Sequence, residues 1–143
     1  MLKGISPLIS PDLIKVLMEM GHGDELVIAD GNFPSASVAR RLVRADGLGC
    51  LALLDAILSL LPLDPHVETP VTLMAVVPGD PYEPVIWDDY RKIILQHETG
   101  FTDFVYVERF AFYERARDTY AVLATSEMAL YANIILKKGV IKA

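Results

Sequence analysis

The sequence predicts a single α/β domain covering residues 1–143, in which helices pack on a mixed, mostly parallel sheet. Apolar runs of strand length alternate along the chain with segments of helical periodicity, an order typical of parallel strands joined by crossover helices. A length of 143 residues suits one domain with its own hydrophobic core. No internal repeat or polar linker divides the chain.

The first two expected elements are a helix and a strand on either side of a histidine. Ser10 is a typical helix N-cap and Gly21 is typical just after a helix end, so a helix is expected between them. Residues 26–29 form an apolar run that indicates a buried strand, followed by the loop sequence DGNFP. This strand therefore has His22 before it and Asp30 after it.

The remaining elements are indicated by hydrophobic periodicity and by the proline and glycine residues between periodic segments. In chain order, we expect a strand at 42–44, a helix at 51–61 ended by Pro62, a strand at 71–77, a helix at 85–97, a strand at 104–108, a helix at 110–118, and strands at 120–125 and 132–140. Because only a short segment separates the last two strands, we expect them to pair with each other in antiparallel fashion.

Composition excludes several classes of partner. The net charge is −6 and the longest basic cluster is Lys137-Lys138, which argues against nucleic acid or an anionic membrane. The longest apolar stretch, residues 51–61, is too short to cross a bilayer. Cys50 is the only cysteine, so no internal disulfide forms and a reducing, cytoplasmic setting is expected. Part of the 52% apolar content is available to cover a subunit interface.

Cofactor and metal signals are missing from the sequence. There is no Walker spacing, no G-x-G-x-x-G after a strand and no G-x-S-x-G elbow. His66 follows a proline in a loop and His97 ends a helix, so both are expected to be surface or capping residues rather than ligands. Because no two histidines have HxH or HxxxH spacing, we expect neither a metal nor another cofactor.

The two polar ends of the 26–29 strand each allow two interpretations. His22 lies between two glycines, where it can act on a ligand or simply hydrogen-bond the end of the preceding helix. Asp30 follows the carboxyl end of a strand, where α/β proteins bind ligands, but it is equally suited to start an Asx-turn. Position alone leaves these alternatives open.

Polar and aromatic residues recur in the second half of the chain. Arg109 is at the end of a strand, and in the helix that follows Phe112 is expected in the core while Tyr113 can face a pocket. Tyr131 and Asn133 precede the last strand, and an aromatic face with an amide is a common way to hold a sugar. Each of these residue types also occurs in structural turns.

Five blocks taken together resemble one known family from end to end: SPDLIKVLMEMGHGDELVIADGNFP, RADGLG, LLPLD, RFAFYERA and LYANIILKKGV. They resemble the D-ribose pyranase/fucose mutarotase family, and the RFAFYERA block is similar to the fucose branch. The resemblance implies an RbsD-like fold and an enzyme that interconverts the α and β anomers of a free sugar, L-fucose or a related one, through the open-chain aldehyde. It also implies ring-like homo-oligomers with sites near subunit contacts.

The resemblance also implies roles for individual residues. The general acid of the family falls on His22, and its substrate-binding carboxylate falls on Asp30. The further substrate contacts implied by the family fall on Arg109, Tyr131, Ala132, Asn133, Asp64 and Tyr113. Asn32 stands where some fucose-type relatives have histidine, so the role of that histidine does not transfer to this chain.

The implied chemistry needs only proton transfer and positioning. The ring oxygen gains a proton while the anomeric hydroxyl loses one, which an imidazole can support near neutral pH. On this hypothesis the strand separates an acid–base group, His22, from a carboxylate that holds the sugar, Asp30. Two alternatives stay open: interconversion of pyranose and furanose forms of ribose, and a non-catalytic oligomer that only binds a monosaccharide. Pure binding does not require a titrating group, which argues against the second.

Overall fold

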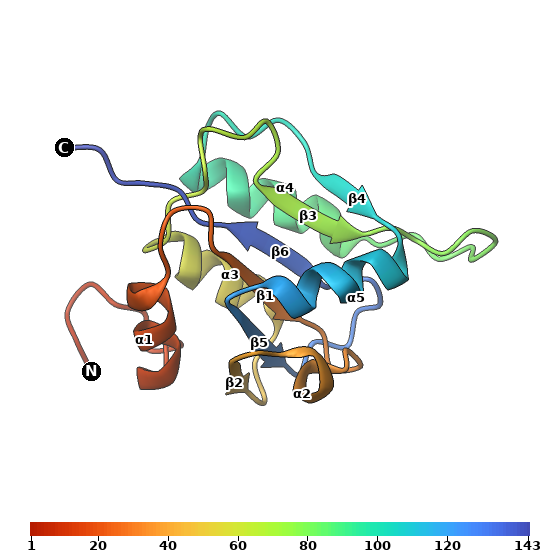
Figure 1. Cartoon of the computed structure of the whole chain (residues 1–143), viewed down its shortest axis with the longest axis horizontal. Coiled ribbons are helices and arrows are strands. Elements are labelled where there is room, and N and C mark those ends of the chain that lie inside the picture. Colours follow the sequence, from red (N-terminus) through yellow and green to blue (C-terminus); the bar gives the residue numbers. More distant parts are fainter.

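In the computed structural model, which describes residues 1–143, six strands form one sheet and helices cover both of its faces (Figure 1). The strands are β1 (Glu25–Ala29), β2 (Leu42–Ala45), β3 (Val71–Met74), β4 (Val105–Val107), β5 (Ala121–Thr125) and β6 (Ile134–Lys137). The helices are α1 (Pro11–Glu19), α2 (Ser35–Val38), α3 (Cys50–Leu58), α4 (Ile86–His97) and α5 (Arg109–Asp118). The strand order is β2-β5-β1-β6-β3-β4.

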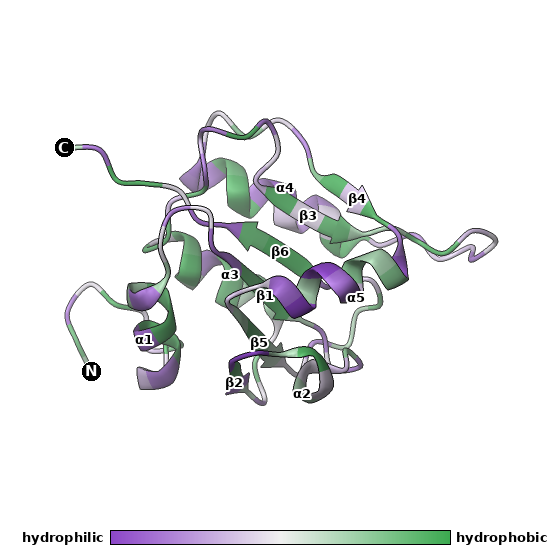
Figure 2. Ribbon diagram, viewed as in Figure 1, coloured by the Kyte–Doolittle hydropathy of each residue, from purple (hydrophilic) through white to green (hydrophobic).

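The two faces of the sheet pack against different helices. In β1, Leu26 and Ile28 point into the larger core with α1, α3 and α4, whereas Val27 and Ala29 join the smaller core with α2 and α5. Side chains alternate between faces along a strand, so a strand buried on both faces must be apolar throughout. Figure 2 shows this as predominantly hydrophobic central strands beneath helices that also carry hydrophilic segments.

The predicted fold class is confirmed, but the predicted pairing of the last two strands is wrong. β5 pairs in parallel with β1 and β2, whereas β6 pairs antiparallel with β1 and β3. The connecting segment 126–133 is bonded to the loop that follows β1, because Gly31 N–H donates to the Glu127 carbonyl (2.9 Å). The chain therefore crosses the end of β1 and enters the sheet on its other side, which leaves β1 between β5 and β6.

Side-chain oxygens cap the N-termini of α1 and α5, and the first of these caps was predicted. Ser10 Oγ accepts a hydrogen bond from Leu13 N–H (3.1 Å) at the start of α1, as expected of an N-cap. At the start of α5, the Glu108 carboxylate accepts from the backbone N–H groups of Phe110 (3.0 Å) and Ala111 (3.1 Å). Both helices thus begin where a side-chain oxygen satisfies N–H groups that lack intrahelical partners.

Several predicted bounds differ from the structure. The helix expected at 51–61 ends at Leu58, because the chain tightens into a turn before Pro62. The strand expected at 71–77 ends at Met74, since the neighbouring strand β4 has only three residues to pair with it. The short helix α2 was not predicted, because four residues are too few to show helical periodicity.

The single antiparallel strand gives the sheet two chemically distinct edges. At one edge, β1, β3 and β4 end and β6 begins; at the opposite edge, β1 begins and β6 ends. The candidate site residues come from distant parts of the chain, and each lies at one of these two edges. None of the helices combines the length and the hydropathy needed to cross a membrane.

Candidate active site

A pocket of about 200 Å³ lies at the edge where the parallel strands end and β6 begins. This is the edge at which open α/β sheets bind their ligands. It is smaller than the roughly 300–1,000 Å³ typical of sites for drug-sized molecules, so it suits a small polar ligand. Its lining residues are Asp30, Asn32, Phe33, Met74, Val77, Asp80, Arg109, Tyr113, Leu130, Tyr131 and Asn133.

A buried carboxylate and a buried amide form the polar floor of this pocket. Asn133 Nδ2 donates to Asp30 Oδ2 (3.0 Å), and Asn133 Oδ1 accepts from Asp30 N–H (2.8 Å). The Asn32 N–H donates to Asp30 Oδ1 (3.0 Å), which is the Asx-turn considered from the sequence. The two interpretations of Asp30 are therefore compatible, since one carboxylate both forms the turn and lines the pocket.

Burial sets the protonation behaviour of this carboxylate. Burial raises the pKa of Asp30, and hydrogen bonds from Asn32, Phe33 and Asn133 oppose that rise only in part. A carboxylate with this environment holds its proton more readily than one in water.

Tyr131 approaches the pocket from a strained backbone. It is the only residue other than glycine with positive φ, at 57°. Its hydroxyl donates to Asp80 Oδ2 (2.5 Å) and accepts from Val77 N–H (3.3 Å). The bond to the carboxylate raises the pKa of Tyr131 and lowers the pKa of Asp80. A non-glycine residue held in this conformation at a pocket points to a functional constraint.

Helix α4 fixes the segment that carries Tyr131. Trp87 Nε1 donates to the Tyr131 carbonyl (2.8 Å), and Tyr90 Oη donates to the next carbonyl, that of Ala132 (2.6 Å). Ala132 is fully buried and does not line the pocket. Its predicted substrate contact is therefore not apparent in the geometry, and it serves here to anchor the residues on either side.

Helix α5 supplies the remaining predicted contacts. The exposed Arg109 guanidinium lies 4.5 Å from the centre of the Phe110 ring and forms no salt bridge, so its donors are available to a ligand. Tyr113 packs edge-on against Phe33, with ring centroids 5.5 Å apart. Phe112 is fully buried, as predicted. Two residues that the sequence did not single out, Asp80 and Phe33, complete this side of the pocket.

His22 and Asp64 lie at the opposite edge of the sheet, outside the pocket. The strand between His22 and Asp30 has five residues and alone spans about 16 Å. One chain therefore cannot bring both side chains to the same small ligand.

A buried carboxylate holds the imidazole of His22. The side chain is 47% exposed, and its Nε2 lies 3.1 Å from Asp64 Oδ1. Its partner is thus a carboxylate rather than a carbonyl at the end of α1, which removes the helix-capping interpretation. Burial raises the pKa of Asp64, but hydrogen bonds from the His66 backbone N–H and from His22 outweigh it, so the pKa is lowered overall.

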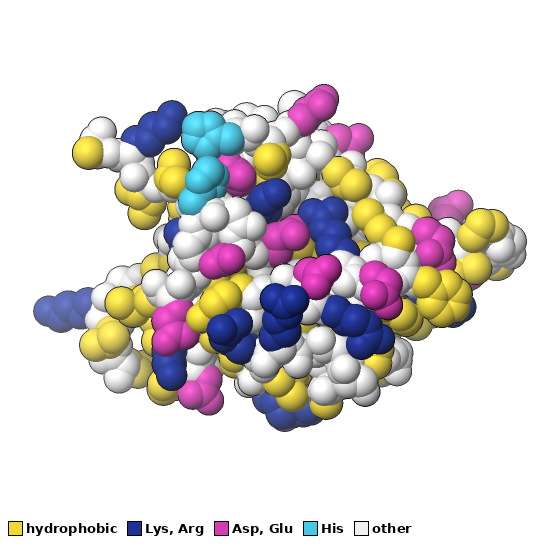
Figure 3. Space-filling model, viewed as in Figure 1, with side chains coloured by type: hydrophobic (Ala, Val, Ile, Leu, Met, Phe, Trp, Pro, Cys, Tyr) yellow, Lys and Arg dark blue, Asp and Glu magenta, His cyan; other side chains and the backbone are white.

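The fold also brings His66 to this place, which the sequence did not predict. The His22 and His66 rings have centroids 5.5 Å apart, and adjacent histidines are visible on the surface in Figure 3. One possible ligand atom from each of His22, Asp64 and His66 lies within 4.8 Å of the other two. The spacing of histidines in the sequence did not indicate this cluster, because His22 and Asp64 are 42 residues apart. His97 instead contacts Asp55, at 2.7 Å.

Close backbone packing places Asp64 beside the end of β6. Gly139 N–H donates to the Pro62 carbonyl (2.8 Å), and Asp64 N–H donates to the Lys137 carbonyl (3.0 Å). A Cβ atom at Gly139 would lie only 2.4 Å from the Leu63 carbonyl oxygen, so glycine is needed for this approach.

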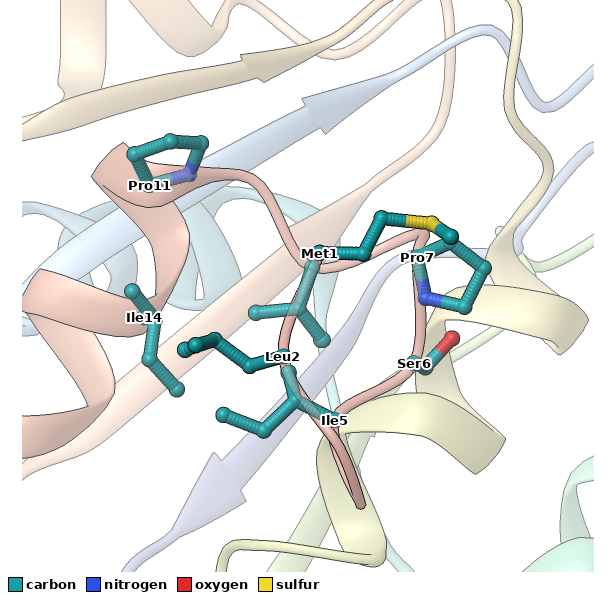
Figure 4. A pocket seen from close by; sticks show the side chains of 8 residues that line it. Met1, Leu2, Ile5, Ser6, Pro7, Pro11 and Ile14 are labelled. Carbon is teal, nitrogen blue, oxygen red and sulfur yellow. The ribbon is translucent and has the colours of Figure 1, made fainter.

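A second hollow, of about 360 Å³, lies between the N-terminal segment and α1 (Figure 4). Its lining side chains are apolar apart from that of Ser6. It lacks the several polar side chains that a sugar needs, which the pocket beside Asp30 and Asn133 provides.

The chain has a one-domain α/β fold with a mixed six-stranded sheet and a small pocket at the strand ends. This arrangement is typical of α/β proteins that bind small ligands. Within that class, the chain belongs to the RbsD / FucU transport protein family, whose model matches residues 3–141. The family resemblance seen in the sequence is thereby confirmed.

Three relatives illustrate how close the similarity is. The chain is 50% identical over 140 residues to the L-fucose mutarotase of Actinobacillus pleuropneumoniae serotype 5b, which covers 98% of this chain and 97% of that protein. It is 53% identical to the fucose mutarotase of Streptococcus pneumoniae crystallised with L-fucose, with a TM-score of 0.93 over 99% and 100% of the two chains. FucU from Bifidobacterium longum is 52% identical, with a TM-score of 0.95 over 98% and 100%.

Proposed function

We propose that this protein is an L-fucose mutarotase, an isomerase that interconverts the α and β anomers of L-fucose through the open-chain aldehyde. The observation that carries the proposal is the full-length similarity, at 53% identity, to a fucose mutarotase crystallised with L-fucose. The small polar pocket with its buried carboxylate–amide pair agrees with a monosaccharide ligand. The ribose-type alternative has no comparable support.

The reaction breaks and re-forms the bond between the anomeric carbon and the ring oxygen. The ring oxygen takes a proton while the anomeric hydroxyl gives one up; the aldehyde then rotates, and the steps reverse. In this proposal His22 carries the proton, because imidazole exchanges protons near neutral pH. Asp64 orients the ring through Nε2, so Nδ1 is the nitrogen that exchanges the proton.

The pocket residues bind the sugar in this proposal. Asp30 and Asn133 are fixed by their mutual hydrogen bonds and present an acceptor and a donor to neighbouring hydroxyls. Arg109 adds unpaired donors, while the Tyr113 and Tyr131 rings cover the apolar face of the sugar. Mutarotation needs only a modest rate acceleration. Orientation of the sugar and one acid–base group can together supply it.

We further infer that the protein is a homo-oligomer in which each site is built from two copies. His22 and Asp30 occupy opposite edges of one sheet, so they contact one sugar only when they come from different chains. A head-to-tail contact between these two surfaces closes into a ring when the rotation between neighbouring chains allows it. Large apolar side chains exposed near the pocket edge are available for the contact: Phe110, Met128 and Leu130.

We place the enzyme in the reducing environment of the cytoplasm. Its one cysteine, Cys50, is buried and unpaired. Burial raises the pKa of this thiol to about 11, so it stays protonated and unreactive. The substrate is a free monosaccharide, and no nucleic acid or membrane partner is proposed.

Anomer exchange of free sugars tests the proposed function. NMR saturation transfer between the two anomeric protons measures the exchange rate at equilibrium without any coupling enzyme. We expect the protein to accelerate exchange of L-fucose more than that of D-ribose or D-galactose. Absence of acceleration for all three sugars would overturn the proposal, and preferential action on D-ribose would favour the pyranase alternative.

A further inference from the structure

The cluster of His22, Asp64 and His66 contains more potential metal ligands than proton transfer requires. We propose that it binds a divalent ion of the late first-row transition metals, Zn²⁺ above all, and that the bound ion inhibits anomer exchange by occupying His22. Metal binding stands on the geometry alone. The inhibition rests on the proposed role of His22 in catalysis.

The distances within the cluster fit one metal ion. All three ligand atoms lie within 4.8 Å of one another, and His22 Nε2 is 3.1 Å from Asp64 Oδ1. Zinc binds histidine nitrogen and carboxylate oxygen at about 2.0–2.2 Å, so two neighbouring ligands of one ion are separated by roughly 3 Å. The observed pair already has that separation, and a small rotation of an exposed histidine closes the rest.

The ligand types fit a late transition metal rather than Ca²⁺ or Mg²⁺. Imidazole suits zinc, copper, nickel and iron, whereas calcium and magnesium prefer all-oxygen sites. Two imidazoles and one carboxylate leave open positions on the ion for water. The cluster is half exposed, so an ion can reach it from solvent.

Asp64 is held in place before any ion binds. It is buried, and its Oδ1 accepts hydrogen bonds from His22 and from the His66 backbone N–H (3.0 Å). Its Oδ2 accepts none within the chain, which leaves that oxygen free for a cation. Since His66 is only two residues beyond Asp64, both ligands come from one anchored segment, and only His22 comes from elsewhere.

A second histidine–carboxylate pair in the chain provides a matched control for the proposed metal site. His97 and Asp55 form a closer pair, at 2.7 Å, with the same ligand types, but no third ligand joins them. Two ligands on the surface bind zinc weakly, so His97 serves as the control for nonspecific binding by an exposed histidine–carboxylate pair.

Occupation of the cluster would block the proposed chemistry directly. A metal bound to the His22 imidazole fixes the ring and its charge, so the ring can no longer donate a proton and recover it. Zinc therefore acts here as an inhibitor and is not required for activity.

Cobalt binding tests the site independently of activity. The full-length protein is treated with EDTA, desalted and titrated with Co²⁺ while visible d–d absorption is recorded, and Zn²⁺ is then added as competitor. We expect one Co²⁺ per chain, displaced by Zn²⁺, with binding weakened at least about tenfold in His66→Ala and Asp64→Asn. His97→Ala should bind like the wild type. An absent spectrum, or one unchanged in His66→Ala, would overturn the metal site.

Exchange of L-fucose anomers tests the inhibition. We expect Zn²⁺ to slow exchange by the wild type and by His97→Ala, EDTA to restore it, and His66→Ala to exchange normally with or without zinc. Zinc that binds the cluster without slowing exchange would overturn the inhibition and argue against His22 as proton carrier. A protein that binds metal but shows no exchange under any condition would refute the proposed function and leave the metal site intact.

Discussion

Asn133 holds Asp30 from two directions, donating to its carboxylate through Nδ2 (3.0 Å) and accepting from its backbone N–H through Oδ1 (2.8 Å). The two residues are 103 positions apart and meet because β6 begins beside the end of β1. This pair fixes the main polar surface of the pocket, so it links the stability of the fold to the binding of the ligand.

Truncation of this amide should destabilise the protein. Asn133→Ala leaves a buried N–H and a buried carboxylate oxygen without a partner, at a cost of about 1–3 kcal/mol for each group. Urea denaturation measures the loss. Asn32→Ala is the matched control, because Asn32 contributes only its backbone N–H to Asp30 and its side chain is exposed. Equal stability of the two variants would contradict the role given to Asn133.

Neutralising Asp30 should chiefly weaken sugar binding. Asp30→Asn keeps the shape but loses a charged acceptor worth about 1.5–3 kcal/mol. The sugar concentration that half-saturates exchange should therefore rise roughly 10- to 150-fold. Exchange rates over a range of L-fucose concentrations check this, with the exposed Asp46→Asn as control. A fall in turnover with unchanged half-saturation would make Asp30 a proton carrier instead.

Loss of His22 should remove catalysis and leave binding. His22→Ala should lower the exchange rate by about 10²–10⁴, the usual contribution of a general acid–base group. The sugar-dependent shift in thermal unfolding should persist, because the pocket residues are intact. His97→Ala should match the wild type. Near-normal exchange by folded His22→Ala would transfer the role to another residue.

Mixing two impaired variants should restore activity at a sugar concentration far below the half-saturation of Asp30→Asn, if each site is shared between copies. His22→Ala and Asp30→Asn chains are unfolded together and refolded as mixed oligomers. With random assembly in a head-to-tail ring, about a quarter of the sites combine an intact His22 with an intact Asp30. Exchange should recover to about that fraction of the wild-type rate. A mixture no more active than its components, with mixed oligomers verified by mass spectrometry, would place each site within one chain.

The two buried carboxylates should give the stability opposite dependences on pH. The folded-state pKa of Asp30 is raised from the ordinary value of 3.8, so its contribution is present below that value and is lost as pH rises through the folded pKa. The folded-state pKa of Asp64 is lowered, so its contribution is present above 3.8 and is lost as pH falls through the folded pKa.

Urea denaturation at a series of acidic pH values separates these contributions. Relative to the wild type, Asp30→Asn should gain stability as pH rises, whereas Asp64→Asn should lose it. Parallel curves for the two variants would contradict the assigned pKa directions. Asp46→Asn is not a suitable control here, because its own pKa is lowered by Arg44. The exposed Glu83 forms no ion pair, so Glu83→Gln is the control.

Local signals account for most of what the sequence predicted correctly. The Ser10 cap and the apolar run of β1 are encoded within a few residues, so the positions of this helix and this strand could be predicted. The partners of β6 were not, because its place depends on contacts between segment 126–133 and the loop after β1. A short connection alone cannot distinguish a neighbouring strand from one across an intervening strand.

The site was predictable as a set of residues and not as an arrangement. Asp30, Arg109 and Tyr131 converge on the pocket as expected. His22 does not, since a strand's length keeps it at the other edge, and His66 joins it through folding alone. Nothing in the sequence indicated the positive φ of Tyr131, because tyrosine is not a residue type that favours this conformation.

The lone antiparallel strand has a genetic consequence. β6 begins directly after Asn133, and at its other end the Lys137 carbonyl accepts a hydrogen bond from Asp64 N–H. One strand therefore reaches both edges of the sheet. In the proposed ring every chain thus serves two adjacent sites. A chain carrying both His22→Ala and Asp30→Asn would impair two sites for each copy incorporated, one in proton transfer and one in sugar binding. Co-expressed with the wild type, such an allele would be dominant-negative, reducing activity by more than its share of the protein.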